Sequence, residues 1–262
     1  MISFNKFSFS ILLFFLFSVL NLQAQTEIIA HRGYWKTPGS AQNSIAALMK
    51  ADSIGVYGSE TDLWLSADGV PVINHDADVT YEGQKLMIEQ TPFETLRKVK
   101  LANGEPLPTV EEYLDAFARC KHTKLIIEFK THKNKESEEI LAQQVIDMVH
   151  ERGLQDKVEY IAFGINFINL VRKIDASAPV YYLNGDLAPQ VIHTLEASGI
   201  DYHHSVFQKY PEWVQQCHNL GLKVNTWTVN TAEDINRVLD LKVDFITTDE
   251  PLLVQKMIEE SK

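Results

Sequence analysis

The chain has 262 residues, a formal net charge of −11, 45% hydrophobic residues and 23% charged residues. This composition excludes a disordered chain, a coiled coil and a collagen-like fibre. The acidic balance argues against a nucleic-acid partner, but it leaves anionic substrates open because a local metal ion can offset their charge.

Residues 1–24 are typical of an export signal rather than of a folded element. Lys6 is the one charged residue among them, an apolar stretch (7–20) follows it, and Leu22-Gln23-Ala24 forms a cleavage signal. The apolar stretch is shorter than the roughly 20 residues of a spanning helix, which disfavours the alternative of a retained membrane anchor. We therefore expect an exported protein, periplasmic or extracellular, without a stable membrane anchor after cleavage.

From Glu27 onward, short apolar or β-branched runs alternate with stretches of helical period, which is typical of βα units. The predicted strands are Ile28 to His31, Gly58 to Trp64, Lys124 to Phe129, Val158 to Phe163, Val180 to Leu183, Asp201 to His204, Lys223 to Thr228 and Val243 to Thr247. The predicted helices are Ser44 to Ile54, Val110 to Arg119, Glu136 to Arg152, Phe167 to Lys173, Pro189 to Ala197, Pro211 to Leu220, Ala232 to Leu239 and Leu252 to Glu259. Eight such pairs predict a (β/α)8 TIM barrel. An open doubly wound sheet is the alternative, but no G-x-G-x-x-G motif follows the first strand.

The segment between the second and third predicted strands is too long for a simple βα loop. Ala67-Asp68-Gly69 indicates a turn, and Val70 to Asn74 reads as an extended run that pairs back on the second strand. The remainder, about 77–108, reads as a small insertion near the barrel mouth. Since no linker or repeat interrupts the chain, we expect a single domain over 25–262 that carries this insertion.

Cys120 and Cys217 lie far apart in the sequence and outside any metal-ligand spacing, which excludes a zinc site built on cysteine. In an exported protein the two could form a disulfide, but two separate core thiols are the interpretation we favour. Spacing alone does not give the distance between them.

Polar residues gather at the carboxyl ends of the predicted strands, where barrel enzymes have their active sites. The clusters are His31-Arg32-Gly33, Glu60-Thr61-Asp62, Asn74-His75-Asp76 and Glu128-Phe129-Lys130. Because side chains alternate along a strand, Glu60 and Asp62 face the same way, and so do Glu128 and Lys130.

Three carboxylates, those of Glu60, Asp62 and Glu128, are thus expected to converge inside the barrel mouth. Like charges repel there unless a cation lies among them. Oxygen ligands without cysteine point to a hard divalent ion, Ca²⁺ or Mg²⁺. The alternative is a salt-bridge network in which the carboxylates pair with Arg32 and Lys130.

His31 and His75 are the candidates for proton transfer, because imidazole titrates near neutrality. Arg32 presents a planar fork of donors that suits a phosphate, and Lys130 adds a second positive charge. Trp227, at a strand end, is expected to form a pocket wall. Together these groups describe acid–base cleavage of a phosphate ester.

Two other residues are expected to have structural or surface roles. Asp249, near the end of the last strand, is expected to cap the final helix. His132 follows the third strand and is expected to be solvated.

Several stretches carry a resemblance to a known family. They are Ile29-Ala30-His31-Arg32-Gly33, Glu60-Thr61-Asp62, Asp68 to Asp76, Leu107 to Glu112, Ile127-Glu128-Phe129-Lys130, Trp227-Thr228-Val229-Asn230 and Ile246 to Pro251. In this order they resemble the glycerophosphodiester phosphodiesterase family over nearly the whole chain after the signal. The resemblance implies a (β/α)8 barrel with an insertion after the second strand. It also implies hydrolysis of glycerophosphodiesters to an alcohol and glycerol phosphate, through attack of the substrate's own hydroxyl and a cyclic phosphate.

The resemblance also implies a role for each candidate residue. The metal ligands would be Glu60, Asp62 and Glu128, the acid–base pair His31 and His75, the phosphate-binding residues Arg32 and Lys130, and the pocket wall Trp227. It does not say which histidine is the base, or whether the metal is Ca²⁺ or Mg²⁺.

Two stretches depart from the family pattern. Ala41-Gln42-Asn43-Ser44 stands where the family usually has Pro-Glu-Asn-Thr, so Gln42 removes a carboxylate from the mouth. Ala77 to Gly83 replaces a segment that is usually rich in Arg and Thr. The head group of the substrate is therefore left open, as is the oligomeric state. Two alternative functions are cleavage of intact lipid, as by a phospholipase, and non-catalytic binding of a phosphodiester.

Overall fold

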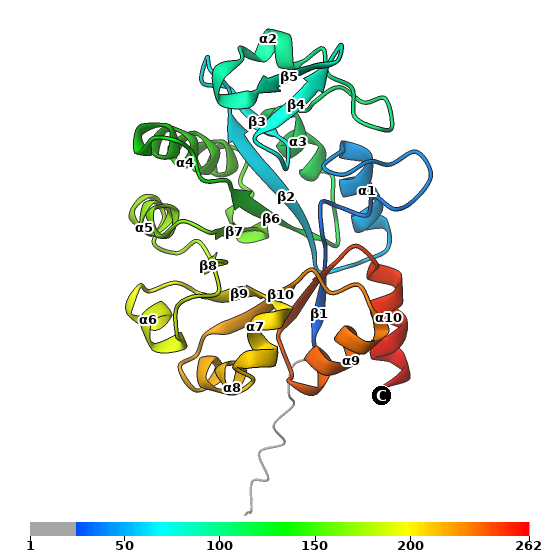
Figure 1. Cartoon of the computed structure of the whole chain (residues 1–262), viewed down its shortest axis with the longest axis vertical. Helices are drawn as coiled ribbons and strands as arrows, with labels where there is room; N and C mark the ends of the chain where they lie inside the picture. The colour runs from blue at the N-terminus through cyan, green and yellow to red at the C-terminus, as the bar shows by residue number, and fades with distance from the viewer. Residues whose placement is uncertain (1–24, 262) are drawn as a thin grey trace, which may run out of the picture.

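The computed structural model describes residues 25–261, and the predicted export signal lies outside them. Eight parallel strands close into a barrel, because β1 pairs with both β11 and β2 (Figure 1). The barrel strands are β1 (Glu27–Ala30), β2 (Gly58–Leu65), β6 (Lys124–Phe129), β7 (Val158–Ala162), β8 (Val180–Tyr182), β9 (Gly199–His203), β10 (Lys223–Trp227) and β11 (Phe245–Thr248). The predicted (β/α)8 barrel is confirmed. Among the described residues, no helix is both long and apolar enough to cross a bilayer.

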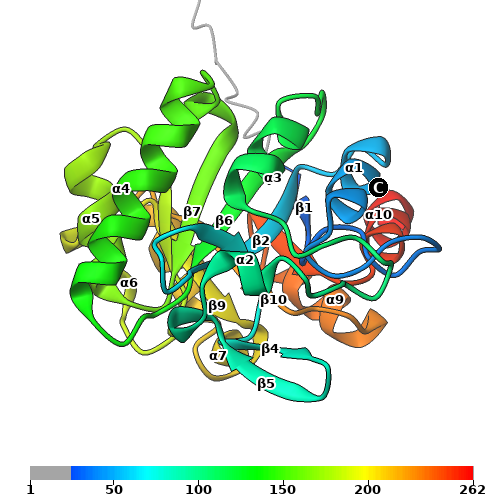
Figure 2. The same cartoon turned by 90° about the horizontal axis from the view of Figure 1, so that it is seen from above.

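Helices surround the barrel, as the view from above shows (Figure 2). In chain order they are α1 (Ile45–Ser53), α2 (Phe93–Leu96), α3 (Val110–Phe117), α4 (Lys135–Glu151), α5 (Ile165–Ile174), α6 (Pro189–Thr194), α7 (His204–Lys209), α8 (Glu212–Asn219), α9 (Ala232–Asp240) and α10 (Pro251–Glu260), with short 3-10 turns at Ile88–Gln90 and Gln155–Lys157. The predicted helices are all present within a few residues. The short helix α7 was not predicted, because its N-cap is His203, which is not among the residue types that usually signal a helix start.

The interior of the barrel changes from apolar to polar toward the carboxyl ends of the strands. Ile29, Ile126 and Phe245 belong to one buried apolar cluster inside it. Two residues further along the same strands, Ile126 is followed by Glu128 and Phe245 by Thr247, and both are buried. Since side chains two apart share a face, these polar groups lie above the apolar layer, and the mouth of the barrel is the polar end.

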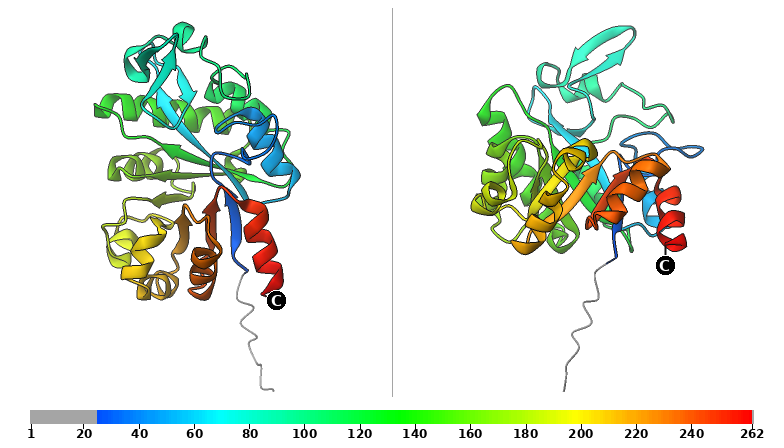
Figure 3. Two further views of the ribbon diagram at one scale, coloured as in Figure 1. Left: turned by 45° about the vertical axis from the view of Figure 1, so that its right-hand side comes forward. Right: turned by 60° about the horizontal axis from the view of Figure 1, so that its bottom comes forward.

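The extended run predicted after the second strand pairs back on β2, as expected. This strand, β3 (Pro71–Ile73), is antiparallel to β2, with Ile73 opposite Leu63. Beyond it, β4 (Asp78–Tyr81) and β5 (Gln84–Met87) form a hairpin that projects past the barrel together with α2 (Figure 3). The inserted segment has a small apolar core of its own, made of Trp64, Val72, Val79, Ile88, Leu96, Val99 and Leu107.

Cys120 and Cys217 are both buried and both free. Burial raises the pKa of the Cys120 thiol to about 11 and that of the Cys217 thiol to about 12. The interpretation of two separate core thiols is confirmed, since neither cysteine forms a disulfide and both stay protonated near neutral pH.

Gly33 is required where the chain turns from β1 toward α1. Its φ is +76°, and a Cβ atom there would lie 2.7 Å from the backbone carbon and the Cβ of Ala47. We expect Gly33→Ala to lower the free energy of unfolding by about 1–3 kcal/mol more than Gly104→Ala does, because overpacking adds to backbone strain. Gly104 is the matched control, since its φ is +87° but nothing lies within 4 Å of its Cβ position. Urea unfolding of both variants measures the difference, and equal losses would contradict it.

Candidate active site

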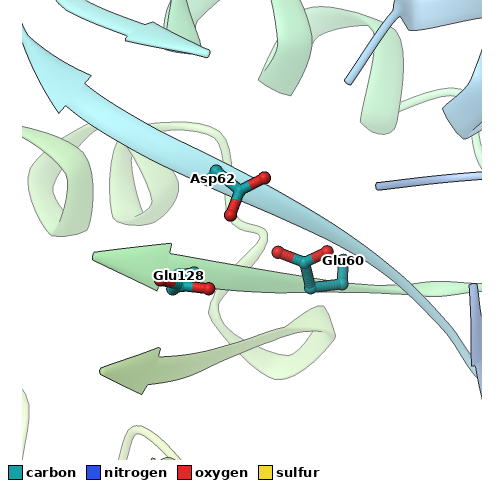
Figure 4. Close-up of side chains that lie close together, drawn as sticks. All are labelled: Glu60, Asp62 and Glu128. Carbon is teal, nitrogen blue, oxygen red and sulfur yellow. The ribbon is translucent and has the colours of Figure 1, made fainter. Parts of the chain in front are cut away.

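Three carboxylates converge at the mouth of the barrel, as side-chain alternation predicts. Glu60 and Asp62 come from β2, and Glu128 comes from the neighbouring strand β6, where it is paired in register with Asp62. One carboxylate oxygen from each residue lies within 4.8 Å of the others (Figure 4). Their side chains are buried, with at most 6% of each residue exposed. Such a cluster concentrates negative charge where water cannot screen it.

Lys130 compensates two of these carboxylates. Its Nζ lies 2.7 Å from Asp62 Oδ1 and 2.6 Å from Glu128 Oε1. Burial alone would lower the pKa of Lys130, but the two carboxylates outweigh it and raise the pKa above its usual value. For Asp62, burial would raise the pKa, but the charges of Lys130 and His75 and the hydrogen bonds from Asn43 and Lys130 together outweigh it, and the pKa is lowered. Lys130 is therefore charged and fixed between two acids.

Glu60 is the carboxylate that the salt-bridge network leaves out. Its Oε2 accepts the backbone N–H of Arg32 at 2.8 Å, but its buried Oε1 has no hydrogen-bond partner within residues 25–261. Burial, followed by repulsion from Asp62 and Glu128, raises the pKa of Glu60 well above its usual value. Burial, followed by repulsion from Asp62, raises the pKa of Glu128 to about 7, although Lys130 opposes the shift.

The donor set fits a hard divalent cation. A salt-bridge network in which every acid pairs with Arg32 or Lys130, our alternative prediction, is only partly present, because Glu60 Oε1 has no partner. A cation at this point would meet three carboxylate oxygens and would lower the pKa values that repulsion now raises. The three carboxylates therefore form a candidate metal site.

Arg32 and Asn43 approach the cluster from the loop between β1 and α1. Arg32 Nε lies 3.8 Å from Asp62 Oδ2, and Asn43 Nδ2 donates to the same oxygen at 2.8 Å. Both residues have a left-handed backbone, with φ of 55° and 60°, which costs free energy in residues other than glycine. Gln42 accepts from Arg32 Nη1 at 2.8 Å, so the amide keeps a hydrogen bond to the guanidinium.

His31 is held by Asp249, which corrects the prediction that Asp249 caps the last helix. The N-cap of α10 is Glu250, and Asp249 Oδ1 instead lies 2.8 Å from His31 Nδ1. Burial would raise the pKa of Asp249, but hydrogen bonds from His31, Trp35 and Asn230 outweigh it and lower the pKa to about 2. An ionised carboxylate only accepts, so Nδ1 donates and the other ring nitrogen of His31 is left for the cavity.

His75 lies across the cavity from β1, at the end of β3. Its Nδ1 is 2.7 Å from Asp76 Oδ1, so it is oriented by a carboxylate in the same way as His31. Burial, followed by the charge of Lys130, lowers the pKa of His75. His75 is therefore neutral near pH 7 and able to accept a proton.

One cavity unites the predicted residues. It has a volume of about 140 Å³, and its lining includes all of the predicted site residues except Asp62, namely His31, Arg32, Glu60, His75, Glu128, Lys130 and Trp227. Asp62 lies behind Lys130. Trp227 forms a wall opposite the carboxylates and is held by a hydrogen bond from its Nε1 to the carbonyl of Asp201. Phe163 packs edge-on against Trp227, with the two ring centroids 5.7 Å apart.

His132 is buried, so the prediction that it is solvated is wrong. Its Nε2 accepts the backbone N–H of Leu65 at 3.0 Å, and its Nδ1 lies 2.7 Å from the carbonyl of Lys130. Burial lowers its pKa, and the neutral ring satisfies both contacts with one tautomer. His132 thus ties the end of β2 to the residue that bridges two carboxylates.

Sequence reasoning did not identify Asn43, Asn230 or Asp249 as parts of this arrangement. Asn43 follows the departure at Gln42, and Asn230 and Asp249 lie in two loops that meet only in the fold. The acidic stretch Thr248-Asp249-Glu250 at a strand end was a usable signal, but it also resembles the start of a helix.

Comparisons with known proteins identify a matching family and similar structures. The model of the "Glycerophosphoryl diester phosphodiesterase family" matches residues 31–253. A glycerophosphodiester phosphodiesterase of Caldanaerobacter subterraneus is 28% identical over 239 residues, which cover 87% of this chain and 95% of that protein. The crystal structure of a glycerophosphodiester phosphodiesterase from Parabacteroides distasonis is 40% identical, with a TM-score of 0.87 over 91% of this chain and 99% of that one.

A more distant relative shares the fold. It is a phosphodiesterase of Oleispira antarctica, solved in complex with the product sn-glycerol-3-phosphate. It is 22% identical to this chain, with a TM-score of 0.75 over 90% of this chain and 97% of its own.

The carboxylate cluster predicts stabilisation by a divalent cation. Ca²⁺ or Mg²⁺ at a hundredfold excess over its Kd should raise the free energy of unfolding by about 2–3 kcal/mol, because the ion binds the folded chain. Glu60→Gln should abolish this gain without destabilising the metal-free protein, since it removes a repelled carboxylate. Glu138→Gln is the matched control, because Glu138 is a buried carboxylate outside the cluster. Thermal unfolding measures both, and a gain that survives in Glu60→Gln would contradict the site.

Proposed function

The chain belongs to the glycerophosphoryl diester phosphodiesterase family, and we propose that it hydrolyses glycerophosphodiesters to an alcohol and glycerol phosphate. The observation that carries this proposal is the single cavity lined by two carboxylate-oriented histidines, two cationic side chains and two members of the carboxylate cluster, Glu60 and Glu128. Each of these groups has a task in phosphodiester cleavage, and together they form the chemical set that the reaction requires.

Arg32 and Lys130 bind the phosphate in this proposal. The guanidinium donates to Gln42 through Nη1 and turns Nε toward Asp62, so Nη2 is left for a ligand, and the ammonium of Lys130 lies at the cavity wall. Both present N–H donors to the phosphoryl oxygens and hold the phosphorus between the two histidines.

Glu60, Asp62 and Glu128 would hold a divalent cation, Ca²⁺ or Mg²⁺. When bound, such an ion supplies positive charge to the phosphoryl oxygens. Without it, burial and repulsion raise the pKa values of Glu60 and Glu128, so the three acids are not all ionised near neutral pH. A cation would favour the ionised form of all three, which supports the metal-ligand role alongside the donor type.

His31 and His75 transfer the protons. One histidine accepts the proton of the glycerol 2-hydroxyl as its oxygen attacks phosphorus, and the other donates a proton to the leaving alcohol as that P–O bond breaks. Water then opens the resulting cyclic phosphate, with the two roles exchanged. Asp249 and Asp76 keep each ring oriented with its second nitrogen free for this work.

Cleavage of intact lipid finds less support in the insertion. Its apolar residues Leu86, Met87 and Ile88 do not form an exposed patch, because Ile88 is fully buried and Leu86 packs against the core of the insertion. The large apolar side chains that are exposed in the described residues lie on the outer helices, at Ile140, Ile165, Val191 and Leu252. We therefore propose a small deacylated diester as substrate rather than a lipid in a membrane. From the export signal that the sequence predicts, we also propose that the reaction takes place outside the cytoplasm, in a periplasm or the medium.

The reaction is tested by release of alcohol and glycerol phosphate from glycerophosphocholine, before and after chelation of divalent cations. We expect chelation to stop hydrolysis and Ca²⁺ or Mg²⁺ to restore it. An analogue that lacks the 2-hydroxyl should not be cleaved, because the attacking group is missing. We expect His31→Ala and His75→Ala each to lower kcat by ~10²–10⁴-fold. Tight binding of the diester without any turnover would instead favour the non-catalytic barrel.

A second substrate separates the roles of the two histidines. An ester of glycerol phosphate with an acidic phenol as leaving group needs no proton on departure. The variant that lacks the acid of the first step should recover most of its activity on this substrate, and the variant that lacks the base should not. Equal recovery in both variants would contradict the assignment of separate roles.

Asp249 is a positioning residue in this mechanism. Asp249→Asn should lower kcat by ~10²-fold or more and leave KM nearly unchanged, because an amide no longer fixes the proton on Nδ1 of His31. Asp244→Asn is the matched control, since Asp244 accepts from His218 at 2.9 Å in a second aspartate–histidine pair outside the cavity. Steady-state kinetics of both variants measure the effect. A similar loss in the two variants would show that Asp249 acts only through stability.

A further inference from the structure

Asp201 is a buried carboxyl that the proposed mechanism does not use. It lies on β9, beside Asn225 of β10 in register, and 1% of it is exposed. Its side chain lines the same cavity as His31 and Glu128. Its Oδ1 is buried without a hydrogen-bond partner among residues 25–261. A buried polar atom without a partner is costly, and its place at a ligand cavity indicates that the partner is the ligand.

The surroundings of Asp201 suit a short polyol. Phe163, Leu183 and Trp227 give the cavity apolar walls, and Asp201 and Thr247 give it polar groups. The volume of about 140 Å³ is below the roughly 300–1,000 Å³ of pockets that enclose drug-sized ligands. A three-carbon unit fits such a space. A larger cavity of about 680 Å³ shares Arg32 and His75 with it, but Asp201 is not among the residues that line the larger one.

The protonation of Asp201 matches a hydroxyl partner. Burial raises the pKa of this carboxyl to about 8, and the charge of Glu128 adds to the shift, although the nearby amide of Asn225 opposes it. Near neutral pH the group therefore carries its proton, so one oxygen donates and the other accepts. A hydroxyl group also both donates and accepts, and an uncharged carboxyl does not repel the phosphate bound nearby.

We propose that Asp201 hydrogen-bonds the terminal hydroxyl of the substrate's glycerol unit and thereby makes the enzyme selective for substrates that carry this hydroxyl. The inference rests on the proposed function. With the phosphate at Arg32 and Lys130 and the 2-hydroxyl consumed by attack on phosphorus, the terminal hydroxyl is the remaining polar group of glycerol. The walls of Phe163 and Trp227 direct it toward the polar side of the cavity, and an acyl ester at this position lacks the hydroxyl.

The test compares two substrates that differ in this hydroxyl. One is glycerophosphocholine, and the other carries propane-1,2-diol in place of glycerol, so that it keeps the attacking hydroxyl and lacks the terminal one. The wild-type protein with its divalent cation should prefer the first by about tenfold or more in kcat/KM. Asp201→Ala should remove this preference by lowering kcat/KM for glycerophosphocholine alone, and Asp201→Asn should keep part of it, because an amide also donates and accepts.

Two further variants separate binding from folding. Asp201→Leu fills the space with an apolar side chain and replaces Asp201→Ala in the comparison if the alanine variant does not fold. Asp52→Ala is the matched control, because Asp52 is a buried carboxyl remote from the cavity that accepts backbone N–H groups of 121–123. It should keep the wild-type preference even if it lowers the midpoint of unfolding.

The outcomes distinguish this inference from the proposed function. If Asp201 variants lose the same factor on both substrates, the residue is structural and the inference is overturned. A wild-type protein that cleaves both substrates equally also overturns it, while the proposed function stands. If the wild-type protein cleaves neither substrate, the proposed function fails and the inference fails with it.

Discussion

Repulsion among three buried carboxylates is the constraint on which the mouth of this barrel depends. Glu60, Asp62 and Glu128 come from adjacent strands, so the pairing of β2 with β6 brings them together whether or not their charges are balanced. The groups that compensate these charges come from the end of β6 and from the loop after β1. Lys130 bridges two of the acids, and the backbone N–H of Arg32 reaches the third.

The loop between β1 and α1 contributes part of that balance at a cost in backbone strain. Arg32 and Asn43 both have positive φ, which residues other than glycine seldom adopt. This conformation lets Arg32 donate its backbone N–H to Glu60 while its side chain lies near Asp62, and it lets Asn43 donate to Asp62. The strained residues are thus those that contact the carboxylates, as is common at functional sites.

Strand periodicity predicted the barrel and the direction of the site residues on its strands. Side chains along a strand point alternately to its two faces, so residues two apart share a face. Glu60 could therefore be grouped with Asp62, and Glu128 with Lys130, before the fold was known in detail. The contacts made by loops could not be predicted in this way. Asp249 has the sequence context of a helix cap, but Asn230, from another loop, accepts its backbone N–H and turns its carboxylate toward His31. The hairpin of β4 and β5 was also missed, because its turn is Glu82-Gly83 rather than one of the usual Asn-Gly or Asp-Gly pairs.

Strand β2 belongs to two apolar cores at once. Leu63 packs inside the main core, whereas Trp64, the next residue, packs into the separate core of the insertion. The insertion therefore packs around a core of its own and pairs with β2 through β3. It also contacts the helices around the barrel, because Glu105 accepts the backbone N–H groups of Ile45 and Ala46 at the start of α1. Variation in this segment can alter what approaches the mouth while the carboxylates on the same strand stay in place.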